Sequence, residues 1–65
     1  MEGWVLIHSF NDAFTAEIAR QVLLNSDIEA VVVNKRDSSY VTLGNVELYV
    51  EPANVAIANE LLKDF

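Results

Sequence analysis

The sequence predicts an α+β domain of β-α-β-β-α order. Three short segments are rich in β-branched and aromatic residues, which favour strands, and two longer segments repeat apolar residues every three to four positions, as amphipathic helices do. The chain has 65 residues, no Cys and a single His, so no disulfide can form within it. A domain of this size buries roughly 60% of the surface that its unfolded chain exposes. We therefore expect residues 1–65 to form one domain that depends on core packing or oligomerisation.

The first strand is predicted over residues 4–10, a run of β-branched, aromatic and long apolar side chains. Asn11 and Asp12 end this run, and either side chain can cap the helix that follows over roughly residues 12–25. Two rows of residues recur at i, i+4 and predict the apolar side of this helix: Phe14, Ile18 and Val22, and Thr15, Ala19 and Leu23.

Two further strands are predicted after this helix. The helix does not end in Gly, so Asn25 or Asp27 is expected to take the left-handed conformation at its exit. Residues 28–34 are β-branched and nearly continuous, and residues 46–50 alternate. The alternation places Val46, Leu48 and Val50 on one face of the third strand and Glu47 and Tyr49 on the other.

A second helix is predicted from Pro52 to the last residue of the sequence. Pro suits the first turn of a helix, where its missing N–H has no partner to lose. The apolar stripe expected along this helix consists of Ile57, Ala58, Leu61, Leu62 and Phe65.

Packing rules place both helices on one face of a three-stranded antiparallel sheet with strand order 1-3-2. This is a ferredoxin-like split β-α-β arrangement without a final strand, so the outer edge of the first strand is expected to be open or covered by a partner chain. The second strand is expected to present one of two apolar pairs on the face opposite the helices: Val31 and Val33, or Ala30 and Val32. We therefore predict a homodimer that buries this face or the open edge. Its candidate surface is Trp4, Tyr49, Val31 and Val33, although Trp4 can equally cap the core.

The charge of the chain argues against two classes of partner. Ten acidic and four basic residues give a net charge of -6, which repels the phosphate backbone of nucleic acid and an anionic membrane surface. No apolar run approaches the roughly 20 residues that cross a bilayer, and the first residues lack the cationic start of a signal peptide. We expect a cytoplasmic protein that binds neither nucleic acid nor membrane.

Motifs for catalysis or cofactor binding are not found in the sequence. A phosphate-binding loop needs several Gly residues, and the chain has only Gly3 and Gly44. A metal site needs three or four convergent ligands, which His8 with scattered carboxylates does not supply. His8 and Ser9 are neighbours on a strand, so their side chains point to opposite faces and cannot act together as base and nucleophile. We expect no catalytic residue, no cofactor and no metal.

The chain resembles a known family along nearly its whole length. The matching residues are a strand ending in Phe10, then Asp12, Ala16-Glu17-Ile18-Ala19, Ile28-Glu29-Ala30, the run 46–50, and a helix with Ala58 and Leu61-Leu62. They look like the small bacterial putative signal-transducing proteins of unknown function, whose fold resembles that of the PII nitrogen-signalling proteins. The family usually has a helix-ending Gly before Ile28, where this chain has Asp27. The resemblance implies this fold and no established activity.

Two functional hypotheses follow. In the first, the chain is a non-catalytic regulatory or protein-interaction module, not an enzyme, and engages a protein partner through the open edge or through the loop 35–45, which matches the PII effector loop. The candidate partner loop residues within this segment are Lys35, Arg36, Asp37, Ser38, Ser39 and Tyr40. Its two adjacent cations and its hydroxyls can also hold an anion or accept a phosphate, whereas the simplest interpretation is an ordinary polar hairpin loop. In the second hypothesis, the chain senses or converts a small molecule in a pocket formed between protomers, with His8 and Arg36 beside a carboxylate.

Overall fold

The computed structural model describes residues 3–35 and 46–65 and confirms the predicted order of elements. The elements are β1 (Val5–Phe10), α1 (Ala13–Leu24), β2 (Ala30–Asn34), β3 (Val46–Val50), a short 3-10 helix η1 (Pro52–Asn54) and α2 (Val55–Leu61). The second helical region is therefore divided: a 3-10 turn starts at Pro52, and the α-helix follows from Val55 and ends at Leu61, before the end of the sequence.

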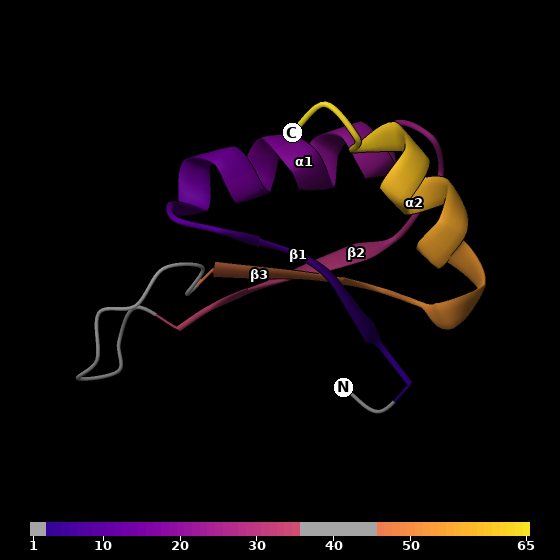
Figure 1. The fold of residues 1–65 in the computed structure, drawn as a ribbon, viewed down its shortest axis with the longest axis horizontal. Helices are drawn as coiled ribbons and strands as arrows, with labels where there is room; N and C mark the ends of the chain where they lie inside the picture. Colours follow the sequence, from indigo (N-terminus) through magenta and orange to yellow (C-terminus); the bar gives the residue numbers. More distant parts are fainter. Residues whose placement is uncertain (1–2, 36–45) are drawn as a thin grey trace.

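The strands form one antiparallel sheet in the predicted order β1-β3-β2. Both helices lie on the same side of this sheet, so the molecule has one sheet layer and one helix layer (Figure 1). The register between β1 and β3 shifts between Leu6 and His8, which marks a bulge that the sequence did not predict. This α+β arrangement is the predicted ferredoxin-like βαββα fold.

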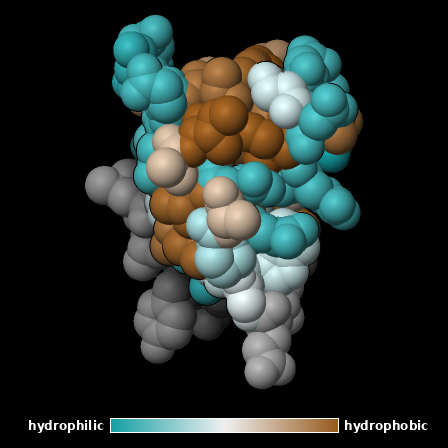
Figure 2. Space-filling view, turned by 90° about the vertical axis from the view of Figure 1, so that its right-hand side faces the viewer, coloured by the Kyte–Doolittle hydropathy of each residue, from teal (hydrophilic) through white to brown (hydrophobic). Residues whose placement is uncertain are grey.

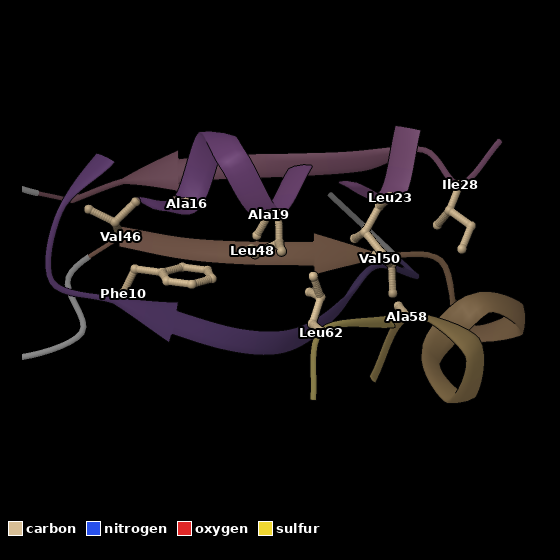
Figure 3. Close-up of a cluster of buried hydrophobic side chains, with 10 residues drawn as sticks. All are labelled: Phe10, Ala16, Ala19, Leu23, Ile28, Val46, Leu48, Val50, Ala58 and Leu62. Carbon is tan, nitrogen blue, oxygen red and sulfur yellow. The ribbon is translucent and has the colours of Figure 1, made fainter. Parts of the chain in front are cut away.

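The core lies between the two layers (Figure 3). Val46, Leu48 and Val50 of the central strand are fully buried there, as their alternation predicts. The other buried residues are Phe10, Ala16, Ala19, Leu23, Ile28, Ala58 and Leu62. Since most of the core residues that come from the helices are Ala, both helices can approach the sheet closely.

Both ends of α1 are fixed by local hydrogen bonds. Asp12 is the N-cap: its Oδ1 accepts from the backbone N–H of Thr15 at 2.8 Å, and its Oδ2 accepts from the Thr15 hydroxyl at 3.0 Å. At the exit, Asp27 takes the left-handed conformation (φ 61°), and the next N–H, that of Ile28, donates to the carbonyl of Leu23 at 2.9 Å. These bonds form a Schellman-type helix end, in which Ile28 enters the core before β2 begins at Ala30.

The predicted apolar side of α1 is partly wrong. Ala19 and Leu23 are buried as expected, but Ala16 takes the third buried position, while Phe14 is 76% exposed and Ile18 is 42% exposed. Successive helical residues are about 100° apart, so Phe14 lies about 160° around the helix from Ala16. The helix is turned so that its small residues, rather than its largest apolar one, meet the sheet.

The stripe predicted for the second helix is likewise divided. Ala58 and Leu62 are buried, whereas Ile57, Leu61 and Phe65 are exposed. None of the helices in the described part of the chain is long and apolar enough to cross a membrane.

Candidate functional site

The side of the sheet that faces away from the helices is one candidate binding surface. The strand register places two cross-strand rows on it: Leu6, Tyr49 and Val31, and Ser9, Glu47 and Val33. We call these six residues the open face. Within the described residues both helices pack on the other side of the sheet. Leu6, on the edge strand β1, is 44% exposed, and Tyr49, Val31 and Val33 are half-buried.

A polar network crosses this apolar surface. The Tyr49 hydroxyl donates a hydrogen bond to Oε1 of Glu47 at 2.7 Å, and the Lys35 Nζ lies 3.0 Å from the same oxygen. The Glu47 side chain is only 15% exposed, so its charge is balanced at close range by the Lys35 ammonium. One carboxylate oxygen therefore links the central strand to the residue that follows β2.

The protonation equilibria of the three groups follow from this geometry. The hydrogen bonds from Tyr49 and then Lys35 hold the pKa of Glu47 below its usual value. The same carboxylate raises the pKa of Lys35 and the pKa of Tyr49, because it stabilises the ammonium and the protonated phenol. At neutral pH the network consists of one anion, one cation and one neutral donor.

The structure brings together most of the predicted dimer surface. Tyr49, Val31 and Val33 share the open face, which also settles the choice left open for β2, since Ala30 and Val32 pack against the core. Trp4 precedes β1 and is half-buried. Leu6 was not predicted for this surface, because the sequence did not show which face of the first strand meets the helices.

The candidate partner loop is only partly within the described residues. Lys35 is described and exposed, and it contacts Glu47 of the open face. The remaining residues of that loop, Arg36, Asp37, Ser38, Ser39 and Tyr40, lie outside the described ranges.

A second candidate surface lies in the helix layer, and the sequence did not predict it. It consists of exposed apolar side chains from both helices and from the last residue of the chain: Phe14, Ile18, Ile57, Leu61 and Phe65. We call these five residues the helix seam. A signal was present in the sequence, because Ala16, Ala19 and Leu23 form an alternative stripe that leaves Phe14 outside, but nothing in the sequence favoured it.

Comparison with protein families decides where the chain belongs. Residues 4–65 match the family described as "Putative prokaryotic signal transducing protein". The chain belongs to this family. No curated protein and no solved structure was found to match it. The predicted membership is confirmed, and the likeness to the PII proteins stays a prediction.

For this family member, only His8 of the two residues named in the second hypothesis lies within the described ranges, since Arg36 lies outside them. His8 pairs with Leu48 on the helix-facing side of the sheet, and its ring centroid lies 4.4 Å from that of Phe10. Ser9 lies on the open face, so the two neighbours do point to opposite sides as predicted. Among the described residues, no three His, Asp or Glu side chains are grouped so that they could hold a metal ion.

Proposed function

We propose that this chain is a non-catalytic signal-transducing module that acts by binding proteins, and that it forms a homodimer through the open face. The observation that carries the proposal is the cross-strand row of Leu6, Tyr49 and Val31 on the side of the sheet opposite both helices. Aromatic and aliphatic side chains that stand side by side on a sheet provide the apolar centre that protein interfaces need.

The charges of the open face support a second copy as its occupant. Each chain carries a net charge of -6, which opposes self-association in general. On the open face, however, the Glu47 carboxylate forms an ion pair with Lys35 at 3.0 Å and accepts a hydrogen bond from the Tyr49 hydroxyl. Two such faces can therefore meet without bringing an unbalanced carboxylate into the interface, and the polar atoms keep their partners when water leaves.

The test is the molar mass in solution, measured by light scattering at several concentrations. We expect the wild-type chain to be a dimer. Tyr49→Glu places a second carboxylate beside Glu47 and removes the hydroxyl donor, and Leu6→Gln removes apolar area at the edge strand; both variants should be monomeric. Leu24→Gln is the matched control, since Leu24 is similarly exposed, 48% against 44% for Leu6, but lies on α1, and it should remain dimeric.

Circular dichroism of each variant shows whether the fold is kept. Leu6→Gln is the safer variant, because Leu6 is 44% exposed and its replacement leaves the core unchanged. A wild-type chain that is monomeric at all concentrations, or a dimer that survives both substitutions in folded chains, would refute the open-face dimer.

A further inference from the structure

The chain contains two Lys residues, and the structure places each in an ion pair of the same length. Lys35 Nζ lies 3.0 Å from Oε1 of Glu47, and Lys63 Nζ lies 3.0 Å from Oε1 of Glu60. The two pairs differ in the burial of the carboxylate, since the Glu47 side chain is 15% exposed and the Glu60 side chain is 71% exposed. Water can therefore take the place of Lys63 beside Glu60, whereas it has little access to Glu47.

The pair of Lys63 and Glu60 belongs to the solvated surface. Glu60 lies in the last turn of α2, and Lys63 follows it by three residues. Figure 2, which looks at the α2 side of the molecule, shows hydrophilic residues that stand out from the helix layer. Exposed pairs of this kind contribute little, so loss of the Lys63 charge should leave the rest of the molecule unchanged. This pair is therefore a control for the pair on the open face.

The pair of Lys35 and Glu47 is unequal in exposure. Glu47 stands on the open face between Ser9 of β1 and Val33 of β2, and neither of these two side chains carries a charge. Tyr49, two residues further along β3, donates its hydroxyl to the same carboxylate as a neutral group. Within the described part of the chain, Lys35 is the only cation that forms an ion pair with Glu47. The Lys35 side chain is 54% exposed, so it can turn to water at little cost and leave the carboxylate without a counter-charge.

Dimerisation through the open face changes what this loss costs. In the free chain, water reaches the open face and solvates the Glu47 carboxylate in part. Two copies that meet at this face exclude the water, so a carboxylate without its cation becomes a buried, unbalanced charge. An interface between two identical faces is symmetric, so every dimer contains two such carboxylates. Loss of the Lys35 charge therefore weakens the dimer more than it weakens the fold.

We propose that the Lys35 ammonium is the switch of the open-face dimer: the protomers stay together while Lys35 is charged, and they separate when this charge is removed. The inference rests on the proposed function, because the dimer concerned is the one that the open face forms. Lys35 is also the first residue of the candidate partner loop, so a change at this position acts directly on the central strand of the sheet. The fold thus links an exposed amine to the assembly state of the module.

Acylation of Nζ is the covalent change that removes this charge. The neutral amine of Lys35 attacks the carbonyl carbon of an activated acyl donor, a thioester or an acyl phosphate. An N–C bond forms, the bond from the carbonyl carbon to the leaving group breaks, and the leaving group departs with the bonding electrons, while the protons lost from nitrogen pass to solvent. The contact with Glu47 raises the pKa of Lys35, so the reactive amine forms after the side chain has left the carboxylate. The product is a neutral amide, which cannot balance Glu47.

The experiment removes the charge at each Lys position in turn and measures the dissociation constant of the dimer by light scattering over a concentration series. Lys35→Gln should weaken the dimer about 30-fold or more, whereas Lys63→Gln, which changes the net charge by the same amount, should not. Lys35→Arg keeps a cation at this position and should remain dimeric. Adding Glu47→Gln to Lys35→Gln removes the unbalanced carboxylate and should restore the dimer. Circular dichroism shows whether each variant is folded.

The modification itself is tested on chains that keep a single Lys. The Lys63→Arg chain and the Lys35→Arg chain are treated with N-hydroxysuccinimide acetate, and mass spectrometry identifies the acetylated positions. The Lys63→Arg chain should become monomeric when Lys35 is acetylated, and the Lys35→Arg chain should remain dimeric when Lys63 is acetylated. The α-amino group reacts in both chains, so it does not account for a difference between them.

Several results in folded chains would overturn the inference. Lys35→Gln could dimerise as tightly as the wild type, Lys63→Gln or Lys35→Arg could weaken the dimer as much as Lys35→Gln, or Glu47→Gln could fail to restore it. An acetylated Lys63→Arg chain that stays dimeric would have the same meaning. The two proposals fail separately. If Leu6→Gln separates the dimer and Lys35→Gln does not, the open-face dimer stands and the switch is refuted, whereas a wild-type chain that is always monomeric refutes both.

Discussion

The open face and the helix seam are both apolar, but they differ in where their charged side chains lie. On the open face, the Glu47 carboxylate sits among apolar side chains and is neutralised by Lys35 and Tyr49. Beside the helix seam, Glu17 and Glu60 form ion pairs with Arg20 and Lys63 whose side chains are exposed, and Phe14 is 76% exposed. The comparison indicates that a carboxylate held among apolar side chains is kept there by close polar partners, whereas exposed ion pairs contribute little because water solvates their charges.

The largest expected effect concerns the layer that supports both surfaces. Leu48 of β3 is fully buried beneath the helix layer. Its neighbours in the strand, Glu47 and Tyr49, lie on the open face. Leu48→Ala should lower the free energy of unfolding by about 2–5 kcal/mol, a large part of the stability of so small a domain. Urea denaturation followed by circular dichroism measures it. Little change would show that the core does not hold the two surfaces in place.

A smaller effect is expected from the hydroxyl of the open face. Tyr49→Phe removes the donor to Glu47 but keeps the aromatic ring, and Lys35 remains beside the carboxylate. The urea midpoint should fall by several times less than in Leu48→Ala. The dimer should persist, since the apolar row is intact. If Tyr49→Phe produces monomers, then the hydroxyl network, rather than the apolar row, holds the open-face dimer together.

The charge balance of the open face predicts that the free energy of unfolding depends on pH. Because folding lowers the pKa of Glu47, its contribution to stability is complete above the usual Glu value of about 4.3 and is lost as the pH falls through the folded value. Folding raises the pKa of Lys35, so that contribution is complete at neutral pH and is lost when the pH rises through the folded value.

Urea midpoints measured from about pH 7 down to about pH 2 test the acidic limb. The wild-type chain should lose more stability over this range than Glu47→Gln, which has no carboxylate to protonate at this position. Parallel curves for the two chains would show that the Lys35 and Tyr49 contacts contribute nothing to folding.

The smallest effect is expected on the helix seam. Phe14 is largely exposed, so Phe14→Gln should change the free energy of unfolding by no more than about 0.5 kcal/mol. Leu24→Gln, on the other flank of α1, provides the matched stability measurement. A clear loss of stability in Phe14→Gln alone would mean that the ring is part of the core, and the contrast between the two surfaces would disappear.

The sheet was the more predictable of the two layers. A strand alternates with a period of two, so the sequence of β3 alone divides Val46, Leu48 and Val50 from Glu47 and Tyr49. Pairing with β2 then decided that Val31 and Val33, rather than Ala30 and Val32, join Tyr49 on the open face. The face of β1 was not predictable, because a bulge between Leu6 and His8 interrupts its alternation.

The sequence by itself determined the order of the strands and helices, and it narrowed the N-cap of α1 to Asn11 or Asp12 and the left-handed exit to Asn25 or Asp27. These features depend on local chemistry: β-branched runs, side chains that accept backbone N–H groups, and the absence of Gly. Only the tertiary structure decided the rotation of α1 about its axis. A helix with apolar residues on more than half of its circumference has several sides that can be buried, and close packing selected the side with Ala16 and Ala19. That selection leaves Phe14 and Ile18 outside and creates the helix seam.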